Sequence, residues 1–179
     1  MTDLLILGKV TPPIGGVTIH TERLLQLLNN QFDFNFYNMR KFKVLSFINA
    51  IKNSKVSHIH ASNPFILLFF SISCMLLRRI SILTIHANVG RHNIFGNLAE
   101  ILAISFCNIP IVINENSLRF AKKVNQNAVL FSSFIEPIEL QPLCLDDQKV
   151  IIELKKRVHT LFCTNAFGFV FDKYNNEIY

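Results

Sequence analysis

The chain has 179 residues, half of them hydrophobic, with a mean hydropathy of +0.34 and a formal net charge of +6. This length suffices for one well-buried domain and leaves little for a second, and the apolar content excludes a disordered chain. A basic balance attracts the phosphates of a nucleotide, a nucleic acid or an anionic membrane surface, without choosing among them.

The longest uncharged apolar run, residues 65–77, is shorter than the roughly 20 apolar residues that span a bilayer. It ends at Arg78, so a buried helix is expected instead of a membrane span. No basic residue precedes the first apolar stretch, which argues against a signal peptide. The four cysteines are far apart and form no CxxC motif, which indicates a cytoplasmic protein whose thiols act as small hydrophobes.

Strand-like and helix-like segments alternate along the first 131 residues. Strands are expected over residues 3–7, 32–37, 56–60, 80–85, 111–113 and 128–131. Helices are expected over residues 17–29, 44–53, 64–77, 93–106 and 117–124, the last one capped by Asn116 or Ser117. This alternation predicts an α/β fold, a Rossmann-like parallel sheet with helices on both faces.

The character of the sequence changes after residue 131. Residues 132–143 contain two prolines and no helical period, a charged helix follows over 146–157, and a strand-like apolar run occupies 161–171. We therefore expect a Rossmann-like domain over 1–131, a connector and helix over 132–158, and the truncated start of a second domain over 159–179.

In parallel sheets, ligands bind beyond the carboxyl ends of the strands, which draws attention to the loops at 9–16, 60–64 and 86–93. Gly15 and Gly16 lie between a strand and a helix. They would serve equally well for close backbone approach to a phosphate or for a tight turn with positive φ. The dinucleotide fingerprint GxGxxG and the P-loop are both absent.

Histidines supply the candidate polar side chains. His86 follows a buried strand, where a site residue would lie, although a histidine bonded to backbone is an alternative. His58 and His60 have a spacing that suits metal ligands. No acidic or cysteine partner has ligand spacing nearby, and His86 need not reach them, so we expect structural histidines and no metal. His20 suits surface, packing or ligand roles equally. No aromatic residues interrupt a basic stripe, so no nucleic-acid partner is expected.

Several segments, taken in order, resemble the N-terminal domain of retaining GT-B glycosyltransferases of the family 4 type. The matching segments are residues 5–8, 12–17, 57–60, 83–86, 111–117, 134–137 and 164–167. The resemblance implies an acceptor-binding domain of a sugar-nucleotide-dependent glycosyltransferase in surface polysaccharide or lipid-linked glycan assembly. It also implies no cofactor and no metal beyond the nucleotide-sugar donor.

The resemblance also assigns residues. His86 would hydrogen-bond the transferred sugar as the catalytic residue. Gly15 and Gly16 would lie against the donor diphosphate and the acceptor. The predicted donor- and acceptor-binding set also contains His20, Asn88 and Arg91.

In the family, the nucleotide pocket and its paired glutamates belong to a second domain. This chain is therefore expected to be inactive alone and to need a companion chain. Its other expected partners are a glycan or lipid-linked acceptor and the inner face of the membrane as a peripheral contact. Two alternatives remain: a partner-binding module without catalysis, and a nucleotide-binding Rossmann protein.

Overall fold

The computed structural model describes residues 2–12, 14–29, 31–131, 135, 145–157, 170–171 and 177–178. The chain divides into two compact units, Met1–Ile138 and Glu139–Tyr179. In the second unit the described elements are helix α6 (Leu145–Arg157) and two short antiparallel strands, β7 (Val170–Phe171) and β8 (Glu177–Ile178). Most of the predicted connector and of the strand-like run at 161–171 lies outside the described residues.

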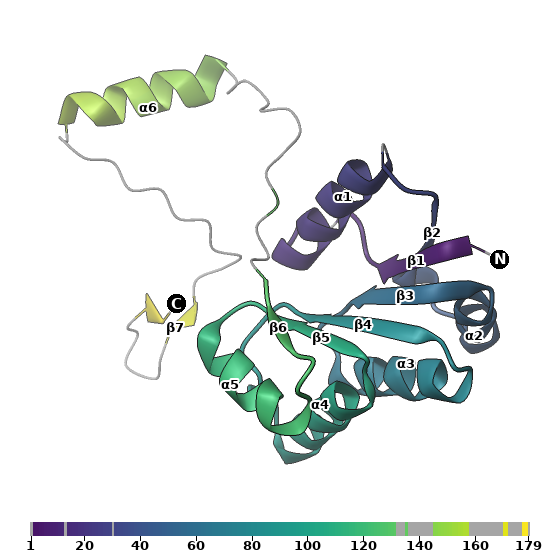
Figure 1. Cartoon of the computed structure of the whole chain (residues 1–179). Helices are drawn as coiled ribbons and strands as arrows, with labels where there is room; N and C mark the ends of the chain where they lie inside the picture. The colour runs from purple at the N-terminus through teal and green to yellow at the C-terminus, as the bar shows by residue number, and fades with distance from the viewer. Residues whose placement is uncertain are drawn as a thin grey trace. The chain divides into compact units, whose positions relative to one another are not determined.

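The first unit is built on a single six-stranded sheet (Figure 1). Its strands are β1 (Thr2–Gly8), β2 (Phe34–Asn38), β3 (Ser54–His60), β4 (Ile80–Ile85), β5 (Ile109–Val112) and β6 (Val129–Leu130). The helices between them are α1 (Gly16–Asn29), α2 (Val44–Lys52), α3 (Pro64–Leu76), α4 (Ile94–Phe106) and α5 (Glu115–Val124), with the 3₁₀ turn η1 (Met39–Lys41) before α2. Every pairing is parallel, and the strand order is β2-β1-β3-β4-β5-β6.

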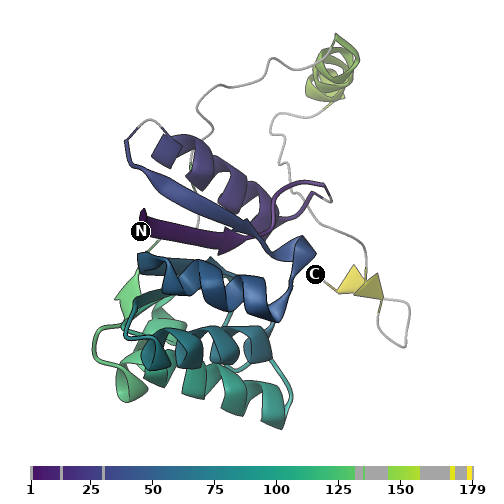
Figure 2. The ribbon, with the colours of Figure 1, turned by 90° about the vertical axis from the view of Figure 1, so that its right-hand side faces the viewer.

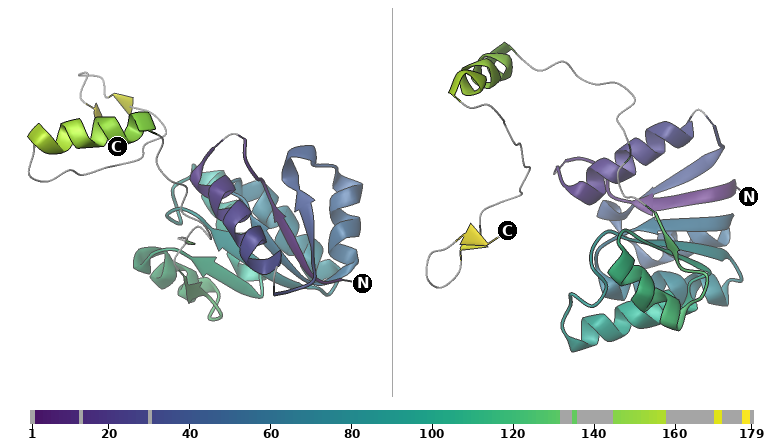
Figure 3. Two further views of the ribbon diagram at one scale, coloured as in Figure 1. Left: turned by 90° about the horizontal axis from the view of Figure 1, so that it is seen from above. Right: turned by 60° about the vertical axis from the view of Figure 1, so that its left-hand side comes forward.

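This order places helices on both faces of the sheet, which confirms the predicted fold class. The chain moves one way from β1 to β2 and then the opposite way from β3 to β6. Because parallel crossovers are right-handed, the reversal moves the helices to the other face. Figures 2 and 3 show α1 on one face of the sheet and α2, α3 and α4 on the other.

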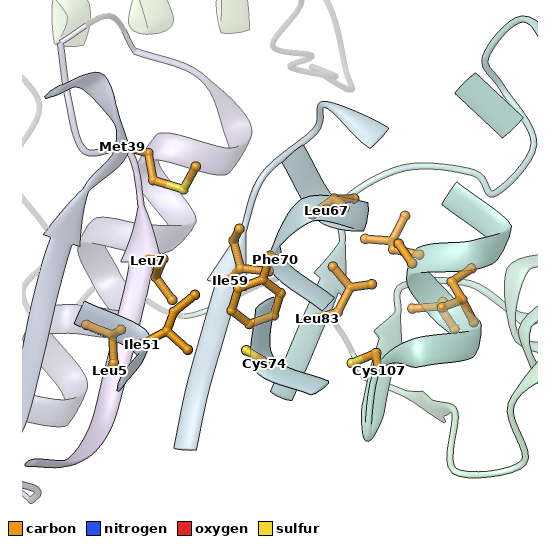
Figure 4. Packing of buried hydrophobic residues seen from close by; sticks show 14 of the residues in the cluster. Leu5, Leu7, Met39, Ile51, Ile59, Leu67, Phe70, Cys74, Leu83 and Cys107 are labelled. Atoms are coloured by element: carbon orange, nitrogen blue, oxygen red, sulfur yellow. The ribbon is translucent and has the colours of Figure 1, made fainter. Parts of the chain in front are cut away.

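The main hydrophobic core lies between the sheet and the α2–α4 layer (Figure 4). Phe47 and Phe70 are both fully buried, and their rings meet edge-on at a centroid distance of 6.5 Å. Cys74 and Cys107 are buried in the same core, as expected from the apolar stretches around them. Within the described residues, no helix is long and apolar enough to cross a membrane, and the apolar run at 65–77 forms most of α3.

The start of α5 differs from the sequence prediction. Its N-cap is Asn114, whose side-chain oxygen accepts a hydrogen bond from the backbone N–H of Ser117 at 2.9 Å. The prediction of Asn116 or Ser117 as the cap was wrong. The polar run Asn114–Ser117 offers several capping side chains, and only the point where β5 ends decides which one is used.

Candidate functional site

The sheet has one point at which the strand order reverses, between β1 and β3, and a crevice forms there beyond the carboxyl ends of both strands. A cavity of about 170 Å³ lies at this point, and we call it the switch-point cavity. It is lined by Lys9, Val17, Thr18, Met39, His60, Ala61, Ser62, Asn63 and Ile66. The lining therefore combines the loop after β1, the first turn of α1 and the loop after β3.

The loop after β1 is fixed at two places. The guanidinium of Arg40 donates to the carbonyl of Val10 from Nε at 3.1 Å and from Nη2 at 2.6 Å. The hydroxyl of Thr11 donates to the carboxylate of Glu22 at 2.8 Å. These contacts tie the loop to η1 and to α1. The rim of the switch-point cavity is thereby held without a ligand.

Gly15 and Gly16 lead directly into α1. Neither has a positive φ, so the tight-turn interpretation of the pair is wrong. A Cβ added at Gly16 would meet no heavy atom within 4 Å, and one at Gly15 would meet only the Thr18 hydroxyl, at 3.7 Å. The glycines thus leave open space beside the helix N-terminus, where backbone N–H groups and the helix dipole favour an anion.

Three histidines from different elements meet at the carboxyl edge of the sheet. His20 lies on α1, His60 ends β3, and His86 follows β4. Nδ1 of His60 and Nε2 of His86 are 3.1 Å apart, and the His20 ring lies 5.1 Å and 4.7 Å, between centroids, from those of His60 and His86. The sequence did not require His86 to reach the pair on β3, and the structure shows that it contacts His60. We call these three residues the histidine cluster.

His58 extends the row along β3. Its ring lies 4.1 Å from that of His60, between centroids, and its Nε2 is 2.8 Å from the hydroxyl of Thr84. The expectation that His58 packs as a structural histidine agrees with this contact.

Burial favours the neutral form of His58, His60 and His86. Loss of solvent, with smaller contributions from the neighbouring imidazoles of His20 and His86, lowers the pKa of His58 to about 3. Burial likewise lowers the pKa of His86 to about 4, with a smaller contribution from His20. Burial also brings the pKa of His60 well below its ordinary value. A neutral imidazole can both donate and accept hydrogen bonds, whereas a charged imidazolium can only donate them.

A second cavity, of about 150 Å³, adjoins the cluster on the α1 face of the sheet, and we call it the histidine cavity. It is lined by His20, Leu24, His58, His60, Thr84, Ile111, Phe131 and Ile135. Arg23 of α1 donates to the backbone carbonyl of Ile135 at 2.8 Å, and this hydrogen bond holds Ile135 at the cavity wall. His60 lines both cavities and lies between them.

The loop after β4 is held by buried and partly buried polar groups. The N–H of Gly90, which has a φ of 87°, donates to the carboxylate of Glu100 at 2.9 Å. The N–H of Val89 donates to the hydroxyl of Ser117 at 3.0 Å, and the side-chain amides of Asn114 and Asn88 are 2.9 Å apart. A loop with this many fixed contacts presents His86 in one orientation.

The structure brings together part of the predicted site. The rings of His20 and His86 lie beside each other, and both lie beside His60, which the sequence interpretation had treated as structural. Asn88 and Arg91 are exposed and line neither of the two cavities. The sequence interpretation missed Lys9 and Thr18, although both lie in or beside the loop that it had singled out.

No family model matches the chain, and no curated protein matches it. The crystal structure of HepE from Anabaena in complex with UDP is similar, with a TM-score of 0.57 over 86% of this chain at 11% identity. The chain spans half the length of the HepE chain. At this identity the likeness shows the fold, and it agrees with the Rossmann-like parallel sheet.

Proposed function

We propose that this chain is the acceptor-side domain of a sugar-nucleotide-dependent glycosyltransferase of the retaining, family 4-like GT-B type, working in surface glycan assembly. The observation that carries the proposal is the switch-point cavity, which joins Lys9, the first turn of α1 and His60 of the histidine cluster at one edge of the sheet. The solved structure of HepE, which shares the fold, holds UDP, and UDP is the leaving group of many sugar donors.

The chemistry of the cavity suits a sugar next to a diphosphate. Lys9 and the first turn of α1 supply positive charge and N–H donors for phosphate oxygens. The Ser62 hydroxyl suits a sugar hydroxyl group because it can donate and accept hydrogen bonds, and the Asn63 amide nitrogen can donate while its oxygen caps α3. Negative charge develops on the leaving diphosphate during transfer, so preorganised donors there would stabilise the transition state.

His86 is the proposed catalytic residue, through a hydrogen bond to the transferred sugar. Its Nε2 lies 3.1 Å from Nδ1 of His60, which fixes the ring, and its Nδ1 is proposed to bond a substrate hydroxyl. The lowered pKa keeps the ring neutral at physiological pH, so it acts by hydrogen bonding and not as a charged acid. Gly15, Gly16 and His20 are proposed to bind donor or acceptor around it, and Asn88 and Arg91 to do so from the outer loop.

Transfer is tested in a chimera that joins this chain to the donor-binding domain of a two-domain enzyme of the same fold. The donor panel is UDP-glucose, UDP-galactose and UDP-N-acetylglucosamine, and transfer to oligosaccharide and lipid-linked acceptors is followed by mass spectrometry. We expect His86→Ala to abolish most of the transfer and Lys9→Ala to raise the KM for the donor. Arg91→Ala tests the outer loop. Wild-type rates in His86→Ala would remove this residue from the mechanism.

A non-catalytic role is the second candidate. In this alternative the chain binds an acceptor or a companion chain and transfers nothing. Calorimetric titration of the chain alone distinguishes the two. The acceptor-side proposal expects the chain to bind an oligosaccharide acceptor and Ser62→Ala to weaken that binding, whereas a partner-binding module shows no such binding.

We further propose peripheral contact with an anionic membrane. Three large apolar side chains near the carboxyl edge of the sheet are strongly exposed: Ile14 at 68%, Ile94 at 84% and Phe95 at 74%. Together with the net charge of +6, such groups suit the interface of a bilayer that carries a lipid-linked acceptor.

A further inference from the structure

The histidine cluster has the composition of a transition-metal site. His20, His60 and His86 each offer one ring nitrogen, and these three atoms all lie within 4.8 Å of one another. The residues come from α1, the end of β3 and the loop after β4, so the sequence separates them widely and only the fold brings them together. Neutral imidazole is a preferred ligand of zinc, copper and nickel ions.

One measured distance fits coordination of a single ion. A zinc–nitrogen bond of about 2.0–2.1 Å places two ligand nitrogens in a tetrahedral site about 3.3 Å apart. Nδ1 of His60 and Nε2 of His86 are already 3.1 Å apart. Small rotations of the side chains would bring the third nitrogen, from His20, to the same centre.

One ring nitrogen of the cluster lacks a hydrogen-bond partner. His60 is only 2% exposed, and its Nε2 is buried without a hydrogen-bond partner. Buried polar atoms in native proteins are nearly always paired. An ion bound at Nδ1 of His60 would leave Nε2 to donate to a partner of its own, as the outer ring nitrogen of a metal-bound histidine usually does.

We propose that His20, His60 and His86 bind a zinc-type divalent cation with three imidazole ligands and one open position facing the histidine cavity. That cavity, of about 150 Å³, is lined by His20 and His60 and can hold the water or ligand oxygen that completes a tetrahedron. None of the residues that line the two cavities is acidic. Magnesium and calcium, which require oxygen ligands, are therefore excluded from this site.

The site goes beyond the proposed sugar transfer, and its test does not use activity. The full chain, stripped with chelator, is titrated with Zn²⁺ in competition with a chromophoric chelator, and Co²⁺ serves as the spectroscopic probe. We expect one Zn²⁺ per chain, no competition from millimolar Mg²⁺, and Co²⁺ absorption bands in the visible range typical of a four-coordinate site. His20→Asn and His86→Asn should each weaken Zn²⁺ binding at least about tenfold, since even loss of outer-shell partners costs 10–100-fold.

The matched control is His92→Asn, which removes a histidine that lies beside Glu100 and outside the cluster, and it should leave the affinity unchanged. Circular dichroism checks that each variant is folded. X-ray absorption on the wild-type zinc complex needs no variant, and it should show three imidazole ligands. A sulfur shell, affinity that persists in the His20→Asn/His86→Asn double variant, or no Zn²⁺ bound by the wild type would each overturn the proposal.

Discussion

The backbone N–H of Gly90 donates a 2.9 Å hydrogen bond to the carboxylate of Glu100, a side chain on α4 that is only 2% exposed. Nε2 of His92 lies 3.7 Å from the other oxygen of the same carboxylate. The buried carboxylate of Glu100 therefore contacts two residues of the loop after β4 and holds this loop in place. Gly90 occupies the left-handed region at φ 87°, which other residues adopt at a cost.

Glu100→Ala should loosen this loop and destabilise the fold. Hydrogen bonds to charged groups contribute about 1.5–3 kcal/mol, so we expect a loss of about 2 kcal/mol in the free energy of unfolding. The measurement is urea denaturation followed by circular dichroism. Glu100→Gln is the matched control, because its amide oxygen can still accept from Gly90, and it should lose less. Equal losses in the two variants would contradict the role of the hydrogen bond.

The cap of α5 gives a test in which the structure and the sequence interpretation differ. Asn114→Ala removes the acceptor for the N–H of Ser117 and should cost about 1 kcal/mol, the usual value of an N-cap side chain. Asn116→Ala is the control, because that exposed side chain lies inside the helix and should cost little. Thermal denaturation decides between them, and a larger loss in Asn116→Ala would restore the cap that the sequence favoured.

Strands and helices of the first unit could be predicted because the hydrophobic period and the length of each apolar run indicate the same type of element. The run Ile80–Ile85 was predicted with the bounds that β4 has, and the apolar run at 65–77 agrees with α3 to within a residue at each end. The cap of α5 could not be read in the same way, since neighbouring asparagines have equal capping ability. Local chemistry alone does not select one of them.

The candidate site was predictable only in part. The three loops were found because ligands bind at the carboxyl edge of a parallel sheet. The meeting of His60 with His86 depends on the register of β3 against β4, where His60 pairs with Thr84, two residues before His86. Register is a tertiary quantity that spacing along one strand does not contain. The buried carboxylate of Glu100 was also missed, because its contact with Gly90 in the preceding loop is likewise a tertiary contact.

The two glycine environments at the ends of the first loop predict opposite outcomes. Gly16→Ala should stabilise the fold by about 0.4–1 kcal/mol, because space is open and the unfolded chain loses freedom. Gly8→Ala should destabilise it by about 1–3 kcal/mol, since its Cβ would lie 2.8 Å from Cγ2 of Thr21. UDP binding to the chimera can also be measured by titration. The chimera that carries Gly16→Ala should bind UDP about tenfold more weakly than the unsubstituted chimera, a change of about 1.4 kcal/mol. Unchanged UDP affinity would argue against phosphate approach at Gly16.

The two described thiols should be inert in the native chain. Burial raises the pKa of Cys74 to about 12 and that of Cys107 to about 11, and only the thiolate reacts with electrophiles. In a Cys144→Ser/Cys163→Ser background, iodoacetamide at pH 8 should label neither residue until denaturant is added. The labelling is read by intact-mass spectrometry. Rapid modification without denaturant would show that this core opens readily.

Membrane contact can be tested at the exposed start of α4. Replacing Ile94 and Phe95 by serine should lower co-sedimentation with phosphatidylglycerol vesicles about tenfold or more, because burying one such side chain contributes about 1.5–3 kcal/mol. Leu76→Ser is the matched control. This side chain is equally exposed, at 73%, but it ends α3 at the amino edge of the sheet, away from the carboxyl-edge loops. A loss of vesicle binding in Leu76→Ser equal to that of the double variant would mean that exposed apolar area alone, and not this edge, governs binding to the vesicles.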